Sequence, residues 1–173
     1  FNKLNGFDEN IKWGMDYECE EFGHRINQNG YTLIASPKTL IRHHFPNGIK
    51  AIKIYYIRVS NWVNFYLNVK KNFERTTATN PLVAIGCISS FFFSLLFIGD
   101  IIFKSLFIKY LLLFFLSLHL IIFIKFYFFV LKKNKKMFLN IFLINFLISN
   151  VIAFSSLAGM LKYFKDKFLN LNR

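Results

Sequence analysis

Two long stretches without a charged residue constrain this chain more than any other feature. Residues 81–99 form a stretch of 19, and residues 137–161 form one of 25. About 20 apolar residues in a helix cross a membrane, because each adds about 1.5 Å toward a hydrocarbon layer about 30 Å thick. A third stretch, residues 106–131, is interrupted only by two lysines and one histidine. The sequence therefore predicts three transmembrane helices, at about 81–103, 106–131 and 137–161.

The composition excludes a soluble globular domain and favours a membrane protein. Hydrophobic residues make up 54% of the 173 residues, and 24 are Phe. So many large apolar side chains cannot be buried inside so short a chain. The net charge is +13, and the basic residues flank the apolar stretches, as the positive-inside rule and anionic headgroups favour. Since they do not form one basic stripe, we expect membrane lipids and no nucleic acid as partners.

The charged loops predict an orientation in the membrane. Residues 132–136 hold four lysines, so this loop is expected to face the cytoplasm. The first transmembrane helix then runs outward and the N-terminal segment is cytoplasmic. The protein is thus predicted to be integral to the inner or plasma membrane. The C-terminal tail, with a net charge of +3 after residue 161, would lie outside, against the same rule.

His119 is the one ionisable residue near the middle of the second predicted span. It could contact a proton or a substrate, as ionisable residues in membranes often do. It could also be a neutral side chain that hydrogen-bonds a neighbouring helix, and this structural interpretation is the one that we favour.

Residues 48–80 are predicted to be an interfacial helix followed by a polar linker. Apolar and aromatic residues recur at helical spacing over about 48–73, and most lysines and asparagines lie on the other side. Such an amphipathic helix can lie on the membrane surface. The alternative is a soluble helix packed on the N-terminal segment.

The N-terminal segment, residues 1–47, concentrates the acidic residues. Asp16, Glu18, Glu20 and Glu21 fall within six residues, at the start of a helix predicted from Glu18 to about Gln28. Short strands are predicted at residues 31–35 and 39–43. The acids can be a solvated helix start, or a site where a carboxylate takes a proton from an attacking hydroxyl. Zinc binding is disfavoured, because the spacing does not bring the available ligands together; those ligands are Cys19, His24, His43 and His44.

The order of these motifs resembles the acceptor half of family 2 glycosyltransferases. A turn at Asn5-Gly6-Phe7-Asp8-Glu9 precedes the acidic helix, and the helix is followed by Asn29-Gly30-Tyr31 and by Pro37-x-x-x-Ile41-x-His43. The resemblance covers roughly residues 1–45. It implies an α+β fragment, the acceptor-side half of a GT-A fold, over residues 1–47. The interfacial helix and linker (48–80) and an all-α membrane region (81–173) would follow.

The resemblance also implies roles for individual residues. The family's usual catalytic base, an Asp, falls on Cys19, and a thiol with an ordinary pKa near 8.5 replaces a carboxylate poorly. Glu18 is therefore the favoured base; Asp16 is the second candidate, and impaired catalysis is the third possibility. The remaining residues that the resemblance implies are the site-supporting Trp13, Glu21 and Arg25, and His43 as ligand of a divalent Mg or Mn ion.

The activity implied is inverting transfer of a sugar from a nucleotide-sugar donor at the cytoplasmic membrane face. The acceptor would be lipid-linked or a polysaccharide, as in synthesis of the cell envelope. The family's Asp-x-Asp motif does not occur in these 173 residues. We therefore expect the donor-binding half to be missing and the chain alone to be inactive. The alternative from a different class is a non-enzymatic accessory membrane protein with three helices and a small acidic head.

Overall fold

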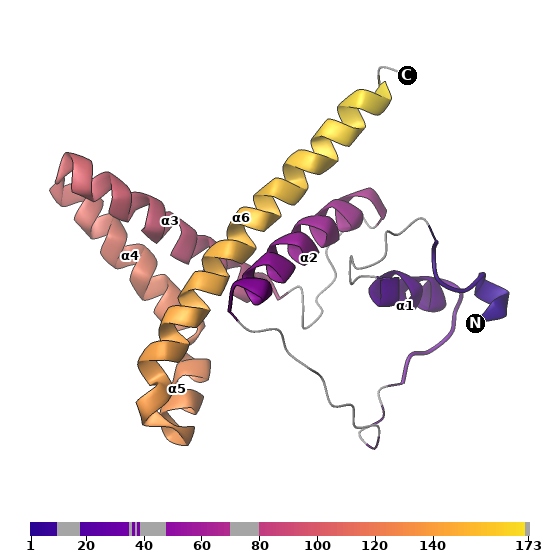
Figure 1. The fold of residues 1–173 in the computed structure, drawn as a ribbon, viewed down its shortest axis with the longest axis horizontal. Helices are drawn as coiled ribbons and strands as arrows, with labels where there is room; N and C mark the ends of the chain where they lie inside the picture. The colour runs from indigo at the N-terminus through magenta and orange to yellow at the C-terminus, as the bar shows by residue number, and fades with distance from the viewer. Residues whose placement is uncertain (10–17, 35, 37, 39–47, 70–79, 172–173) are drawn as a thin grey trace.

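The computed structural model describes residues 1–9, 18–34, 36, 38, 48–69 and 80–171. Every regular element in these residues is a helix (Figure 1). In chain order they are η1 (Asn2–Leu4), α1 (Glu18–Gln28), α2 (Gly48–Val69), α3 (Pro81–Phe103), α4 (Leu106–Ile122), α5 (Ile124–Lys133), η2 (Lys135–Met137) and α6 (Phe138–Leu171).

The expected α+β fragment of a GT-A fold is wrong for the described residues. The first predicted strand, at residues 31–35, is irregular over 31–34, and the second, at 39–43, lies outside the described residues. A strand is stable only when a neighbouring strand pairs with its backbone groups, and the described part of the chain contains no such neighbour. Ile34 is accordingly 87% exposed and Leu33 is 54% exposed, so these side chains gain no burial from a sheet.

The α3–α4 pair is a hairpin of two apolar helices. Asn80 caps α3, because its side-chain oxygen accepts a hydrogen bond from the backbone N–H of Leu82 at 3.0 Å. Pro81 follows at the first helical position, where the missing N–H costs nothing. At the other end Lys104 adopts a left-handed conformation and terminates α3. Residues of α3 and α4 then face each other, as the stacked rings of Phe92 and Phe115, 5.3 Å apart, show.

A sharp bend divides the segment that the sequence predicted as one span at 106–131. Helices α4 and α5 meet at Phe123 with an angle of 64° between them. Gly86 of α3 makes room for this bend, since a Cβ atom there would lie only 2.7 Å from the Phe123 ring. The bend thus depends on a close approach between elements distant in sequence.

Helix α6 is the element against which α2, α3 and α5 pack (Figure 1). One close approach is at Gly159, where a Cβ atom would clash with the backbone oxygen of Ser60 in α2. Nearby, Lys162 donates to the side-chain oxygen of Asn61 at 3.2 Å, and Tyr56 stacks on Phe154 at 6.0 Å. In these contacts a higher-numbered residue of α2 meets a higher-numbered residue of α6. The two helices therefore run side by side in the same direction.

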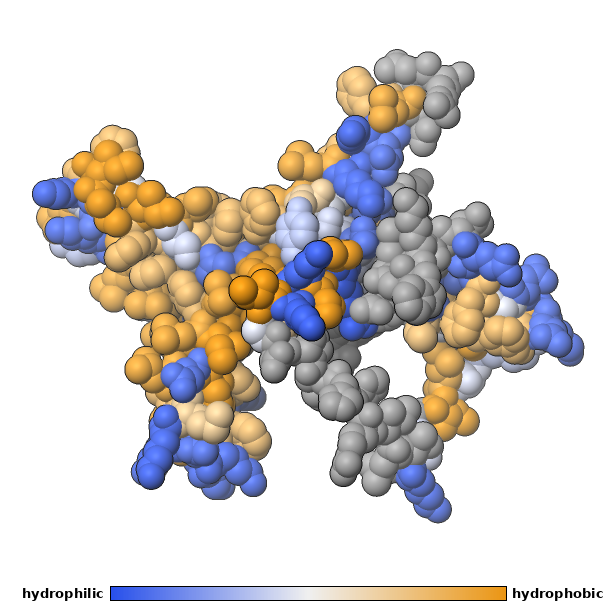
Figure 2. All heavy atoms as spheres, viewed as in Figure 1, coloured by the Kyte–Doolittle hydropathy of each residue, from blue (hydrophilic) through white to orange (hydrophobic). Residues whose placement is uncertain are grey.

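The described interior of this helical region mixes polar and apolar side chains, and its exterior is apolar. The buried polar side chains are His119, Ser89, Ser90, Ser149 and Ser155, and the buried apolar ones are Val63, Tyr66, Cys87, Tyr127, Val130 and Ala153. Large apolar side chains are instead exposed over α3, α4 and α6, and hydrophilic residues gather near the helix ends (Figure 2). Small and polar residues between helices, with apolar residues outside, are typical of proteins whose solvent is lipid.

Two helical segments are long and apolar enough to cross a membrane, namely Pro81–Phe103 and Lys135–Leu169. The bent pair α4 and α5 would make a third if it forms one broken span. These segments indicate association with a membrane. Helix α2 is not among the candidate spans within the described residues.

Candidate functional site

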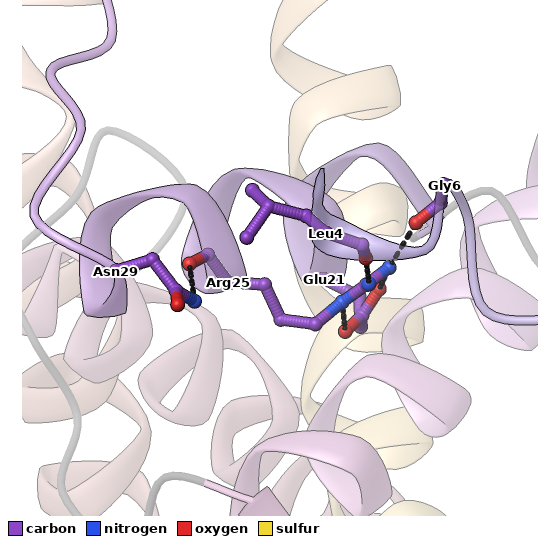
Figure 3. Close-up of polar contacts among 5 residues, drawn as sticks. All are labelled: Leu4, Gly6, Glu21, Arg25 and Asn29. Atoms are coloured by element: carbon purple, nitrogen blue, oxygen red, sulfur yellow. Dashed lines mark hydrogen bonds and ion pairs between the residues drawn. The ribbon is translucent and has the colours of Figure 1, made fainter. Parts of the chain in front are cut away.

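The candidate site lies in the N-terminal region, where α1 packs against the turn that follows η1. Arg25 of α1 makes the connection (Figure 3). Its guanidinium donates to the backbone oxygen of Leu4 at 2.5 Å and to that of Gly6 at 2.6 Å. It also donates from two nitrogens to both carboxylate oxygens of Glu21, one turn earlier in α1, at 2.5 and 2.8 Å. One side chain therefore joins two segments that lie 19 to 21 residues apart in sequence.

Glu21 and Arg25 form an ion pair through two hydrogen bonds. Glu21 is only 7% exposed, so its carboxylate depends on Arg25 to replace the hydrogen bonds that water would provide. The hydrogen bond with Glu21 in turn raises the pKa of the Arg25 guanidinium above its ordinary value. Asn29 extends the arrangement, because its side-chain nitrogen donates to the Arg25 carbonyl at 2.8 Å and helps to close the last turn of α1.

The turn itself needs residues that tolerate a left-handed backbone. Asn5 has φ 57° and Gly6 has φ 61°; Asn and Gly adopt such angles at the lowest cost. Gly6 also has no room for a side chain, since a Cβ atom would lie 3.0 Å from the Phe1 ring. This backbone directs the carbonyl of Gly6 toward Arg25.

Three aromatic rings form the apolar support of the site. Phe1, Phe7 and Phe22 lie within 5.1–5.5 Å of one another, measured between ring centroids. The guanidinium of Arg25 lies 5.2 Å from the centroid of the Phe22 ring, a distance at which a cation is attracted to the ring face. The aromatic cluster and the Arg25 contacts therefore hold the turn and α1 in one arrangement.

A pocket of about 300 Å³ opens beside these contacts. Three carboxylates and one guanidinium line it, so its formal charge is negative; the lining residues are Asn5, Phe7, Asp8, Glu9, Glu21 and Arg25. Carboxylate and amide oxygens can accept hydrogen bonds from the hydroxyl groups of a polar ligand. The pocket thus has the chemistry to hold a hydroxylated molecule, but Arg25 is already committed to protein partners.

The predicted catalytic residues lie at the start of α1. Glu18 is its first residue, and its Oε2 atom is buried and has no hydrogen-bond partner among the described residues. Cys19 is a free, exposed cysteine. Neither residue lines the pocket beside Arg25 within the described part of the chain. The structure therefore brings Glu21 and Arg25 together and leaves Glu18 and Cys19 as a separate group at the helix start.

Three of the predicted site residues lie outside the described residues, namely Trp13, Asp16 and His43. Among the residues that are described, no group of three or more His, Cys, Asp or Glu side chains is placed to hold a metal ion. The metal site expected at His43 is thus a prediction that the described residues leave open.

Sequence reasoning missed two features. It treated the Asn5–Glu9 turn as a motif but did not connect the carbonyls of Leu4 and Gly6 to Arg25, because backbone acceptors carry no signal in the sequence.

Sequence reasoning also missed the partners of His119. Nδ1 of His119 lies 3.1 Å from the Gly86 carbonyl in α3, and Nε2 lies 2.9 Å from the Tyr127 hydroxyl, which also accepts from Asn145 at 2.8 Å. The predicted hydrogen bond from His119 to a neighbouring helix is confirmed.

Comparisons with known proteins add no identity to these observations. The chain matches no protein-family model, no curated protein and no solved structure. The functional argument therefore rests on the residues and their geometry.

Proposed function

We propose that this chain is part of a membrane-anchored glycosyltransferase that transfers a sugar, with inversion, from a nucleotide sugar to a lipid-linked or polysaccharide acceptor. The observation that carries the proposal is the set of contacts made by Arg25. These contacts hold the Asn5–Glu9 turn against the acidic helix. The turn and the helix are the first two motifs of the glycosyltransferase resemblance. The GT-A sheet is not part of the proposal, because the described residues contain no strand.

Glu18 is the proposed general base. Its Oε2 atom is buried and has no hydrogen-bond partner among the described residues, and in this proposal it is the atom that accepts the proton. In the transfer, the carboxylate takes the proton of the acceptor hydroxyl while that oxygen forms a bond to the anomeric carbon of the donor. The bond from that carbon to the diphosphate breaks, and the nucleoside diphosphate leaves with the electron pair. Placement on the first turn of a helix would hold the base in a fixed position.

Glu21 and Arg25 are positioning residues in this proposal. Arg25 has its donors committed to Glu21, Leu4 and Gly6, so its role is to fix the turn relative to α1. The polar pocket beside it, with Asp8 and Glu9, is the proposed place for hydroxyl groups of the acceptor. A divalent Mg or Mn ion belongs to the proposal through the resemblance alone, with His43 as its expected ligand.

The membrane region supports an acceptor that is itself bound to a membrane. Two or three of its helices are long and apolar enough to cross a bilayer. Helix α2, which follows the N-terminal region in the chain, packs against α6. A lipid-linked or growing glycan acceptor would be available at such a surface. We propose that the N-terminal region acts on the cytoplasmic side, following the cluster of four lysines at residues 132–136, at the end of α5 and in η2.

The second candidate is a non-enzymatic accessory membrane protein. It is favoured by the separation between Glu18 and the pocket lined by Glu21 and Arg25, because a catalytic base should line the space that the acceptor occupies. In this case the charged pair would serve only to hold the head together.

The test is a transfer assay on membranes that contain the full-length protein, compared with membranes from cells lacking it. A panel of radiolabelled nucleotide sugars is supplied, and label is counted separately in organic-solvent extracts and in precipitated polymer. Label in the extract identifies a lipid-linked acceptor, and label in the precipitate identifies a polysaccharide. If no donor gives label above the membranes that lack the protein, the transferase proposal is wrong and the accessory protein is the better assignment.

A further inference from the structure

A basic surface lies at the turn between α5 and α6, outside the candidate active site. Four exposed lysines form this surface, namely Lys132 and Lys133 at the end of α5 and Lys135 and Lys136 in η2. Two backbone hydrogen bonds close the turn. Asn134 donates to the Val130 carbonyl at 2.8 Å, and Met137 donates to the Asn134 carbonyl at 3.2 Å. The four lysines are therefore held together on one short turn.

No carboxylate neutralises these lysines in the described part of the chain. The nearest acidic residues in the sequence are Asp100 and Asp166, and the lysines of the turn form no ion pair with any described residue. Four ammonium groups on so short a segment repel one another, so an anionic partner would stabilise the surface.

The ends of the helices place this turn at the headgroup level. Lys133 is the last residue of the bent pair of α4 and α5, and Lys135 is the first residue of the candidate span that continues through α6. The charge-free stretch of residues 137–161 follows directly. A turn between two such apolar segments stays outside the hydrocarbon layer, because its ammonium groups and free backbone groups would lose their hydration inside it.

Exposed apolar side chains lie next to the lysines, on the side away from the turn. In a helix, residues four apart share a face, so Lys132 lies one turn beyond Phe128 and Lys133 lies one turn beyond Phe129. Phe128 is 65% exposed and Phe129 is 59% exposed. Leu139, in the first turn of α6, is exposed as well. The hydrophilic end of α5 borders this apolar surface in Figure 2. The surface thus combines positive charge at the turn with apolar contacts one helical turn away.

From the charge, the level in the membrane and the neighbouring apolar side chains, we infer that this turn binds anionic phospholipids. The lipid phosphate lies at the lysines, and the acyl chains lie along Phe128 and Phe129. A nucleic acid or an acidic protein segment would match the charge but would leave these two rings without an apolar partner. The inference does not depend on the proposed transferase activity, so either can fail without the other.

Photocrosslinking in lipid nanodiscs tests the inference. The full-length protein is placed in phosphatidylcholine discs with a trace of a phospholipid that carries a diazirine on its acyl chain. Two probes with the same chain are compared, one with a phosphatidylglycerol headgroup and one with a phosphatidylcholine headgroup, and the adducts are mapped by mass spectrometry. Near the turn, at residues 126–131 and 137–141, the anionic probe should give more than about fivefold the adducts of the zwitterionic probe, since each lysine contributes roughly that factor. At the charge-free residues 92–98 of α3 the two probes should label equally.

Matched variants assign this preference to the charge of the turn. Lys132→Gln should lower the preference near the turn roughly fivefold, whereas Lys132→Arg, which keeps the charge, should retain it. Lys109→Gln, at an exposed lysine near the start of α4, should leave the preference at this turn unchanged. Raising the salt concentration to 0.5 M should weaken the preference in the unmodified protein, because the interaction is between exposed charges.

Three results would overturn the inference. An equal preference for the anionic probe near the turn and at residues 92–98 would show that the lysines select no lipid. A preference that survives Lys132→Gln, Lys133→Gln and the two combined would remove the role of these lysines. A single-stranded oligonucleotide that crosslinks to the lysines and displaces the anionic probe would identify nucleic acid as the partner. The salt series needs no substitution, so it keeps the test valid even if a variant fails to fold.

Discussion

The two regions of this chain are held together by different kinds of contact. In the N-terminal region, Phe1, Phe7 and Phe22 pack together, and charged groups lie around them. In the described membrane region, His119 and four serines are among the most deeply buried residues, beside small apolar residues such as Cys87 and Ala153, and the phenylalanines are mostly outside. The first arrangement is stabilised by transfer of apolar surface out of water. The second gains nothing from that effect, so its helices must be joined by close packing and hydrogen bonds.

This contrast also divides function between the regions. Carboxylate side chains gather in the N-terminal region, at Glu18 and around the pocket beside Arg25. In the membrane region, His119, Tyr127 and Asn145 are engaged with one another. We therefore expect substitutions in the first region to affect chemistry, and substitutions in the second to affect stability.

The largest effect is expected for Glu18→Gln in the full-length protein. Glutamine keeps the size and hydrogen-bonding reach of glutamate but cannot take the proton, so the turnover number should fall by about 10²–10⁴-fold. The Michaelis constant should change far less, because the loss acts on the transition state. The measurement is the sugar-transfer assay with a saturating donor.

Two further variants sharpen this result. Cys19→Ser should cost little if the thiol only occupies the position of the family's aspartate, and Cys19→Asp should raise the rate if it restores the usual pair. Asp16→Asn tests the other carboxylate. If Asp16→Asn abolishes turnover while Glu18→Gln keeps it, then Asp16 is the base and the alignment of Glu18 is wrong.

The next largest effect concerns close packing in the membrane region. Gly86→Ala would place a Cβ atom 2.7 Å from the Phe123 ring, and such overpacking costs about 1–3 kcal/mol. The variant should unfold at a lower SDS fraction in mixed micelles, as measured by circular dichroism.

Gly99→Ala is the matched control in the same helix, because nothing lies within 4 Å of its Cβ position. It should gain up to about 1 kcal/mol from helix propensity. Equal effects at both glycines would contradict the close approach.

Hydrogen bonding in the membrane region should contribute less than packing. A carbonyl can only accept, so Nδ1 of His119 carries the proton toward Gly86, and in the neutral ring Nε2 accepts from Tyr127. Tyr127→Phe leaves both Nε2 and the Asn145 amide without this partner. Such bonds in membranes average about 0.6 kcal/mol, with a maximum near 1.7, and the same unfolding assay should show a loss in that range. Tyr110→Phe, on an exposed face of α4, should have no effect.

The parts of the fold that the sequence predicted are those with a local cause. Helix α1 begins at Glu18 and ends at Gln28, as predicted from its apolar spacing and the Asn29-Gly30 pair. Helix α3 covers residues 81–103, where a charge-free stretch follows Pro81. The strand at 31–35 failed because pairing depends on other strands, which propensity alone cannot provide. The bend at Phe123 and the Arg25 contacts were missed because both depend on residues distant in sequence, Gly86 in one case and Leu4 and Gly6 in the other.

The smallest effect is expected for the charged pair of the N-terminal region, and it tests whether that region is held together as inferred. Glu21→Gln keeps the side-chain volume but removes the charge that Arg25 faces at 2.5–2.8 Å. Trypsin cleaves after arginine only when the chain around it opens, so cleavage after Arg25 in the full-length protein should become faster. The pair is partly exposed and therefore screened, so we expect the cleavage rate to increase about twofold.

Glu9→Gln is the control, because Glu9 lines the same pocket without bonding to Arg25 in the described contacts. A similar rate increase in both variants would mean that the carboxylates act through the overall charge of the pocket. Cleavage unchanged in Glu21→Gln would show that the backbone carbonyls of Leu4 and Gly6, with the three phenylalanine rings, are sufficient to hold Arg25 in place.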